Sequence, residues 1–337
     1  MKQEHTDLCK YYFRGRKLYD EYFDKVLEWV LSVPNASQTE YKQFWRTISS
    51  KEYSDVTTRI LTDARTVANH LYYKVDILDA PVSIPDFEDG LTSDLKWHVV
   101  NHKKMLILSD IHFPYHDKQA VMVALRTGKQ QNVDSILLNG DILDFYQLSK
   151  FTKDFRKPSV KAELDIFRFF IDQLKQRFPD AAIYYKTGNH EVRMDRWIKH
   201  NAQMFDGMLD LEHLIDFKAS DIVYLKDNIG VKFGKLNIIH GHEVRANGSL
   251  VNIARTYYMK CNSNILLGHW HQAQEFSTKT LSGEVHGAWA TGCLCKLDAD
   301  YTYGINSWNH GFAIVEATDD KGNFKVKNYK IVNGEVV

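Results

Sequence analysis

Five short apolar segments between residues 105 and 268 share one pattern that limits how this chain can fold. Each is a largely unbroken apolar run, and each leads directly into Asp, Asn or His. Apolar runs of this length without alternation predict strands that are buried on both faces. The expected strands cover 105–110, 135–140, 183–188, 236–240 and 264–268, and helical patterns cover 117–130, 159–177 and 249–260. This alternation predicts an α/β fold with a mostly parallel sheet, whose functional loops follow the carboxyl ends of its strands.

Residues of the metal-binding type follow every one of these strands. After the first strand, Asp110 and His112 stand two residues apart, so an extended backbone would point both side chains to the same side. A carboxylate beside an imidazole suits a divalent cation. The later strands end in Gly140, Asp141 and Asp144; in Gly188, Asn189, His190 and Glu191; in His240 and His242; and in Gly268, His269 and His271. The repetition predicts a shared metal site, and the glycines suit a backbone that bends sharply beside a ligand.

Composition narrows the class of protein. A chain of 337 residues with 44% hydrophobic residues can bury a large core. Lys plus Arg and Asp plus Glu number 43 each, so no net charge draws the chain to nucleic acid or membrane, although a local basic patch would be enough for a nucleic-acid substrate. The cysteines, Cys9, Cys261, Cys293 and Cys295, show no paired spacing, and no apolar run approaches the ~18 residues of a membrane span. We therefore expect a cytoplasmic protein without membrane contact.

The chain divides into a helical N-terminal module (1–80), a linker or extended crossing segment (81–103) and a metal-binding domain (104–337). In the module, apolar residues between Leu18 and Val30 recur at helical spacing, and Ser37 with Glu40 forms a capping-box pattern that opens a second helix. Ser54 or Asp55 caps a third helical pattern. We expect these helices to mediate oligomer or partner contacts, and a helix-turn-helix reader of nucleic acid is the alternative.

Three segments near the C-terminus alternate polar and apolar residues. They cover 284–291, 312–318 and 325–332. Alternation of this kind is typical of strands with one buried face. We expect these segments to be antiparallel strands of a second sheet.

Together, the strand-end residues resemble the motif set of the calcineurin-like metallophosphoesterases. That set reads D-x-H, G-D-x-x-D, G-N-H-[DE], H and G-H-x-H. It occurs here in order as Asp110-x-His112, Gly140-Asp141-x-x-Asp144, Gly188-Asn189-His190-Glu191, His240 and Gly268-His269-x-His271. The resemblance covers most of 104–337 and leaves out the N-terminal helices. It implies a four-layer α/β/β/α sandwich with a helical appendage, and a hydrolase with a binuclear metal centre.

By motif position, the resemblance implies seven metal ligands and two catalytic residues. Asp110, His112 and His271 would hold one ion, Asn189, His240 and His269 would hold the other, and Asp141 would bridge both. Two such ions clamp an in-line displacement at phosphorus, with a metal-bridging hydroxide as the expected nucleophile. Mixed Asp, Asn and His ligands favour manganese, our first choice, or iron or zinc over magnesium and calcium. His190 would steady the phosphoryl oxygens or protonate the leaving oxygen, and Asp144 would orient its imidazole.

The residues after the second motif bear on the substrate. In the protein phosphatases of this family the motif continues as Asp-Arg-Gly, and its arginine binds phosphate, whereas Phe145 follows Asp144 here. This departure counts against a protein phosphatase, and another cation has to take the place of that arginine. The candidates are Arg193, Arg196, Lys153, Arg156 and Lys157, the last three in a basic segment, 150–161, that also contains Phe151 and Phe155. Basic residues interleaved with aromatic ones suit a groove that follows a phosphate backbone and stacks bases.

We therefore expect a metal-dependent phosphodiesterase that acts on nucleic acid or nucleotides, as in the nuclease branch of the family, the Mre11/SbcD-like exonucleases. The alternatives are a phosphomonoesterase acting on a small molecule or phosphoprotein, and a non-catalytic scaffold of the same fold. No ligand of the motif set is missing, which argues against the scaffold. The residues expected to be structural are His242, His286, His310, Cys293 and Cys295.

Overall fold

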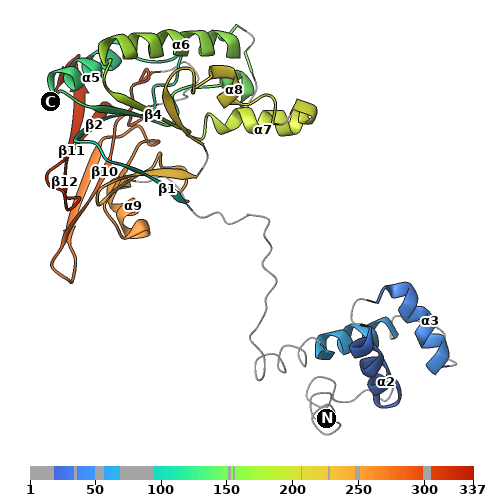
Figure 1. Cartoon of the computed structure of the whole chain (residues 1–337). Helices are drawn as coiled ribbons and strands as arrows, with labels where there is room; N and C mark the ends of the chain where they lie inside the picture. Colours follow the sequence, from blue (N-terminus) through green and yellow to red (C-terminus); the bar gives the residue numbers. More distant parts are fainter. Residues whose placement is uncertain are drawn as a thin grey trace. The chain divides into compact units, whose positions relative to one another are not determined.

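The computed structural model of the chain divides into two compact units, Met1–Leu91 and Thr92–Val337 (Figure 1). The structure describes residues 19–33, 36–49, 57–68, 95–150, 153–154, 156–205, 207–226, 228–246, 251–298 and 305–337. In these ranges every helix is too short or too polar to span a bilayer.

The N-terminal unit packs three helical segments around its own core. They are α2 (Tyr19–Ser32), α3 (Gln38–Ile48) and a helix over 57–68. The structure has the expected capping box at the start of α3: the Ser37 side chain accepts a hydrogen bond from the Glu40 backbone N–H, and the Ser37 N–H donates to the Glu40 carboxylate at 2.7 Å. Trp45 is completely buried among the three helices. The expected caps of the third helix, Ser54 and Asp55, lie outside the described residues.

The larger unit contains two sheets. The seven-stranded sheet has the order β13 (Glu335–Val336), β12 (Phe324–Val332), β11 (His310–Ala317), β2 (Lys104–Leu108), β3 (Ser135–Asn139), β4 (Ala182–Lys186) and β5 (Ile222–Leu225). The six-stranded sheet has the order β1 (Lys96–Val100), β6 (Ile229–Phe233), β7 (Leu236–Ile238), β8 (Ile265–Leu267), β10 (Val285–Ala290) and β9 (Gln274–Lys279). β2 to β5 pair in parallel, and so do β7, β8 and β10.

Helices cover the outer face of each sheet (Figure 1). The helices of this unit are α5 (Lys118–Gln130), α6 (Val160–Arg177), α7 (Val192–Asn201), α8 (Leu211–Ile215) and α9 (Ile253–Cys261), with short 3₁₀ turns at Tyr146–Leu148 and Gln203–Phe205. Along β2, Leu106 and Leu108 pack into the core beneath α5 and α6, while Met105 and Ile107 pack against the other sheet. A third core lies between α9 and the six-stranded sheet. The observed layers therefore confirm the expected α/β/β/α sandwich.

The expectation that one parallel sheet holds all five apolar strands is wrong. β2, β3 and β4 lie in the seven-stranded sheet, whereas β7 and β8 lie in the six-stranded sheet. The expectation of a separate C-terminal sheet is also wrong in part, because β11 pairs antiparallel with β2, and β12 with β11. An apolar run reports burial on both faces, and in a four-layer sandwich either sheet provides that burial. Strand β1 lies within the segment 81–103 and pairs in parallel with β6.

Glu163 of α6 is a buried carboxyl group next to the loop that follows β3. Its Oε2 accepts a hydrogen bond from the backbone N–H of Phe145 at 2.7 Å, and Oε1 has no hydrogen-bond partner among the described residues. Burial raises the pKa of Glu163 to about 8, and the carboxylate of Asp144 adds to the rise. Glu163 therefore keeps its proton in the folded protein near neutral pH.

We expect the stability of the Glu163→Gln variant, relative to that of the wild type, to be greater at pH 8 than at pH 5. The pKa is raised on folding, so the wild-type contribution is full below about 4.5 and is lost as the pH rises toward about 8. The wild-type free energy of unfolding should fall across this window by up to about 1.4 kcal/mol per pH unit, whereas glutamine does not titrate. Urea unfolding of both proteins at the two pH values measures the difference. An equal difference at pH 5 and pH 8 would mean that Glu163 is ionised in the fold.

Candidate metal centre and adjoining cavity

Loops from both sheets meet at the carboxyl ends of β2, β3, β4, β7 and β8. Two glycines allow this approach. A Cβ on Gly188 would lie 2.2 Å from Asp141 Oδ1, and a Cβ on Gly140 would lie 2.5 Å from His240 Nδ1. Gly140 also has a φ of +83°, a conformation that favours glycine. Side chains at these two positions would force the loops apart.

The loop after β2 does not have the extended backbone that was expected from the Asp-x-His spacing. β2 ends at Leu108, and Asp110 and His112 have φ angles of 56° and 52°. Their N–H groups donate to the carbonyls of Gly140 and Asp141 at 3.1 and 3.0 Å, so pairing between the two loops fixes the left-handed turns. Asp141, His269 and His271 also have positive φ, between 51° and 71°. Such conformations cost about 1–3 kcal/mol each and persist where the surroundings enforce them.

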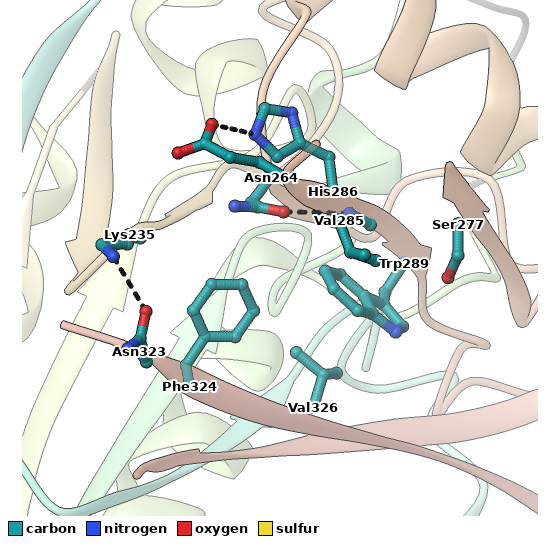
Figure 2. A pocket seen from close by; sticks show the side chains of 11 residues that line it. Lys235, Asn264, Ser277, Val285, His286, Trp289, Asn323, Phe324 and Val326 are labelled. Atoms are coloured by element: carbon teal, nitrogen blue, oxygen red, sulfur yellow. Dashed lines mark hydrogen bonds and ion pairs between the residues drawn. The ribbon is translucent and has the colours of Figure 1, made fainter. Parts of the chain in front are cut away.

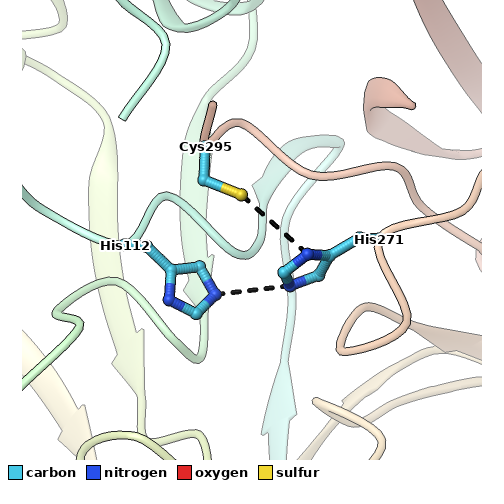
Figure 3. Close-up of side chains that lie close together, drawn as sticks. All are labelled: His112, His271 and Cys295. Atoms are coloured by element: carbon cyan, nitrogen blue, oxygen red, sulfur yellow. Dashed lines mark hydrogen bonds between the residues drawn. The ribbon is translucent and has the colours of Figure 1, made fainter. Parts of the chain in front are cut away.

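Asp110, His112 and His271 form one group of ligand-type atoms. The Oδ1 of Asp110 lies 3.2 Å from His271 Nε2 and 4.0 Å from His112 Nε2. The Nε2 atoms of the two histidines face each other at 3.3 Å (Figure 3). Two imidazole nitrogens and a carboxylate oxygen at these distances can share one cation.

Asp141 lies at the junction of two such groups. Its Oδ2 is 3.3 Å from His240 Nε2 and 3.9 Å from His112 Nε2. It clusters with His240 and His269 on one side and with Asp110 and His112 on the other. A carboxylate in this position can bridge two ions.

Four buried ligand-type atoms have no hydrogen-bond partner among the described residues. They are Asp110 Oδ1, Asn189 Oδ1, His240 Nε2 and His269 Nδ1. A buried polar atom without a partner costs free energy, which a bound cation would offset. The donor set of carboxylate, amide oxygen and imidazole fits manganese, iron or zinc. The residues present therefore fit a binuclear metal centre.

Contacts behind the imidazoles fix which nitrogen is turned to the centre. His240 Nδ1 lies 2.8 Å from the carbonyl of Asn139, and His112 Nδ1 lies 2.9 Å from Asp144 Oδ1. Donation of the Nδ1–H to these oxygens leaves the Nε2 lone pair for a metal. His271 Nδ1 lies 3.9 Å from Cys295 Sγ (Figure 3).

Two histidines of the centre have pKa values that are shifted in opposite directions. Burial lowers the pKa of His240, but the Asp141 and Asp110 carboxylates raise it to about 10. Burial also lowers the pKa of His269, together with the nearby His240, to about 4, so His269 is neutral. A divalent ion at this site would compete with a proton for the Nε2 of His240, so its binding would release a proton.

Glu191, the last residue of the third motif, holds the Asp141 loop. Its carboxylate accepts hydrogen bonds from the backbone N–H groups of Asp141, Ile142, Leu143 and Gly188 and from the Tyr185 hydroxyl, at 2.8–3.1 Å. No role for Glu191 was predicted from the sequence. Its place in the motif was the available signal, because a carboxylate can order a loop that has several unpaired N–H groups.

Glu243 does the same for the loop after β7. Its carboxylate accepts from the N–H groups of His240 and Gly241 at 3.1 and 2.6 Å and pairs with the buried Lys186 at 2.6 Å. Burial raises the pKa of Glu243, but Lys186 and the histidines lower it to about 2. This pair was not predicted from the sequence, because Lys186 is the last residue of a largely apolar strand, β4. His242, half-buried, lies beside Glu243, and His310 contacts the carbonyl of Cys295.

His190, Asp144 and Arg193 meet beside the metal centre. His190 Nδ1 lies 2.9 Å from the carbonyl oxygen and 3.2 Å from the Oδ1 of Asp144. Arg193 donates to the same carbonyl at 2.8 Å, and its Nη2 lies 2.7 Å from His190 Nε2. Burial lowers the pKa of His190, but the carboxylates of Asp141 and Asp144 raise it on balance. Because an arginine can donate only to an unprotonated nitrogen, the contact with Arg193 corresponds to a His190 that carries its proton on Nδ1.

A cavity of about 490 Å³ lies between α7 and the loop after β3, and we call it the α7 cavity. Its lining residues are Leu148, Ser149, Lys150, Lys153, Asn189, Arg193, Arg196, Trp197, His200 and Asn201. The cavity brings Arg193, Arg196 and Lys153 together. Arg156 and Lys157 do not line it: Arg156 pairs with Asp154 at 2.8 Å, and the Lys157 ammonium lies 5.9 Å from the centre of the Tyr115 ring. Phe151 and Phe155 lie outside the described residues.

A second cavity, of about 410 Å³, lies near the amino ends of β7, β8 and β10, at the ends of these strands away from the metal centre. Figure 2 shows the residues that line it. Asn264 and Lys235 in its wall precede β8 and β7, and His286 lies near the start of β10. The metal-type residues follow the carboxyl ends of the same strands. This cavity is therefore separate from the metal centre, and so is His286.

Comparison with known proteins places these observations in a family. Residues 103–301 match the family model described as calcineurin-like phosphoesterase. The Gene 54 proteins of Mycobacterium phages L5 and D29 are each 24% identical, over 247 and 249 residues, with 69% of this chain and 95% of each relative covered.

Two solved structures also align with this chain at low similarity. Vacuolar protein sorting 29 from Cryptosporidium parvum aligns with a TM-score of 0.37 and 12% identity over 70% of this chain and 95% of that one. YfcE, a phosphoesterase from E. coli, aligns with a TM-score of 0.31 and 14% identity over 66% and 98%. The family match, which covers more than half of the chain and includes the loops described above, shows that this protein belongs to the calcineurin-like phosphoesterases.

Proposed function

We propose that this protein is a binuclear metal-dependent phosphodiesterase that acts on nucleic acid or nucleotides. The observation that supports it best is the α7 cavity, which joins the cluster of unpaired ligand atoms at Asn189 and has basic walls. A phosphoester with more than one negative charge suits such a cavity. A phosphomonoester needs only the metal centre and one cation. The described cysteines, Cys261, Cys293 and Cys295, carry free thiols, which suits our proposal of a cytoplasmic location.

The proposed metal ligands follow from the two groups that share Asp141. Asp110, His112 and His271 would hold one ion, Asn189, His240 and His269 the other, and Asp141 would bridge them. When bound, two such ions polarise the phosphoryl oxygens and lower the pKa of water for in-line attack at phosphorus. Manganese is our first choice for this donor set.

Arg193 takes the place of the arginine that the second motif lacks. Its guanidinium contacts His190 and Asp144 at the edge of the centre, so a phosphoryl oxygen arriving there would compete for its N–H groups. If Arg193 turns to the phosphate, the Nε2 of His190 becomes free to take a proton. The carboxylates of Asp141 and Asp144 favour that protonated form. His190 can then donate the proton to the leaving oxygen.

Asp141→Asn should lower metal occupancy at both positions and abolish activity. The asparagine keeps the Oδ1 atom that accepts the His190 N–H at 2.8 Å, so the loop retains this contact while the shared charge is lost. His269→Ala should empty mainly one position. Elemental analysis of the purified variants after desalting measures both effects. Two tightly held ions per chain in Asp141→Asn would contradict the bridging role.

His190→Ala should keep its metal content and lose activity according to the leaving group. We expect kcat to fall by roughly 10²–10⁴ for an alkyl ester, which needs a proton on the leaving oxygen. The loss should be smaller for a p-nitrophenyl ester, which does not. Steady-state rates on the two esters with Mn²⁺ measure the ratio. Equal losses would assign His190 to electrostatic stabilisation instead of proton donation.

A further inference from the structure

We propose that the α7 cavity is a nucleotide subsite, in which Trp197 stacks on a base and Arg196 and Lys153 bind a phosphate next to the scissile one. This inference rests on the proposed phosphodiesterase activity. It names the part of the substrate that lies outside the metal centre: a nucleoside phosphate, from either a single strand or a small nucleotide.

The position of the cavity connects it to the chemistry. Asn189 and Arg193 belong both to the cavity wall and to the centre. Asn189 Oδ1 is one of the unpaired buried atoms, and Arg193 contacts His190. One substituent of a phosphorus atom bound at the centre would therefore enter the cavity.

The cavity wall carries more positive charge than the binding of a single phosphate group requires. Its walls carry Lys150, Lys153, Arg193 and Arg196, and no Asp or Glu is among the described residues that line it. Arg193 lies against His190, whereas Arg196 lies one helical turn further along α7 and Lys153 comes from the loop after β3. A substrate with a second phosphate would use cations at these more distant positions.

Trp197 gives the cavity an aromatic surface. Its side chain is 38% exposed, and Asn201 donates to its carbonyl at 2.9 Å, so the residue is part of an ordered helix end. Base stacking on an exposed aromatic ring typically contributes about 1–3 kcal/mol and tolerates any base. An indole between basic side chains matches the alternation of base and phosphate in a nucleotide chain.

Ser149 supplies a second, independent indication of a ligand. Its side chain is only 6% exposed, and its Oγ has no hydrogen-bond partner among the described residues. The residue lines the cavity, and a hydroxyl can donate to a phosphate oxygen or accept from a sugar hydroxyl. A volume of about 490 Å³ lies within the usual range of small-ligand sites.

The cavity in Figure 2 lacks this combination of features. Its wall contains both Lys235 and Glu284, so its charges are mixed. Its aromatic pair, Trp289 and Phe324, packs edge to face with ring centres 5.8 Å apart. The wall in Figure 2 also contains an unpartnered buried atom, His286 Nδ1, so the α7 cavity differs from it by having several cations, no described Asp or Glu, and the exposed indole of Trp197.

Two p-nitrophenyl diesters test the proposal, because they share a leaving group and differ in the other substituent. Thymidine 5′-(p-nitrophenyl phosphate) carries a nucleoside, and methyl p-nitrophenyl phosphate does not. With Mn²⁺, Trp197→Leu should raise KM for the nucleoside ester by about 5- to 150-fold, which corresponds to the stacking range. Arg196→Ala should raise KM for the same ester carrying an added 3′-phosphate, which supplies the second phosphate, and should leave KM for the plain nucleoside ester unchanged. The methyl ester should react at wild-type rates.

Matched variants control for the loss of a ring or a charge. Trp97→Leu removes an indole of equal exposure, 39%, from β1, and Lys199→Ala removes a charge from α7 outside the cavity wall. Both should leave the two KM values unchanged. If Trp197→Leu impairs both esters equally, or neither, the cavity is not a nucleotide subsite. If Arg196→Ala raises KM equally for the nucleoside ester with and without the 3′-phosphate, or for neither, Arg196 binds no second phosphate and that part of the proposal is overturned.

Binding without turnover separates the subsite from the activity. Thymidine 5′-monophosphate should quench the tryptophan fluorescence of the chelator-treated full-length protein, and Trp197→Leu, but not Trp97→Leu, should abolish the quenching. Equal quenching in all three proteins would overturn the proposal even if the protein is an active diesterase. If wild type hydrolyses neither ester, the proposed function fails while this binding result still decides the subsite. A single-stranded oligonucleotide that binds more tightly than the monophosphate, with a steeper salt dependence, would identify nucleic acid as the source.

Discussion

The rest of the centre depends on the interactions that stabilise the buried carboxylate of Asp141. Taking a carboxylate out of water costs several kcal/mol unless charges and hydrogen bonds offset it. Its Oδ2 lies 3.3–3.9 Å from the Nε2 atoms of His240, His190 and His112. These imidazoles hold the pKa of Asp141 well below its usual range, against the effect of burial, which raises it. Gly188 is required opposite the same carboxylate, because a Cβ there would overlap Oδ1.

A second set of carboxylates keeps this arrangement in place. Glu191 accepts hydrogen bonds from four backbone N–H groups of the loops around Asp141. Glu243 accepts two from the loop that carries His240. These bonds fix the two loops that carry Asp141 and His240. The histidines are likewise oriented through their Nδ1 atoms. The donors are therefore preorganised, which lowers the cost of binding ions in the correct geometry.

Helix α7 links the centre to the cavity. It begins directly after the third motif, and its first turn supplies Arg193 to His190. Further along, the same helix supplies Arg196 and Trp197 to the cavity wall. The spacing of these residues on one helix would fix the distance between a phosphorus atom at the proposed metal centre and a substituent in the proposed subsite. Helix α7 therefore connects the two proposed sites.

The sequence by itself determined the family, the layered α/β class and the residue types of the centre. Five apolar runs that each end in Asp, Asn or His can be read directly, because burial and strand period are local properties of the chain. The capping box at Ser37 and Glu40 was equally local, and the structure has it.

Only the tertiary structure decided how these local features combine. It assigned β7 and β8 to a different sheet from β2, because apolar runs do not encode their pairing partner. It gave Asp110 and His112 left-handed conformations, because their N–H groups donate hydrogen bonds to carbonyls of the loop after β3. It also brought Arg193 and Arg196 to the α7 cavity and left Arg156 paired with Asp154 outside it. Charge can be counted along a chain, but the wall on which each charge lies depends on contacts between residues far apart in sequence.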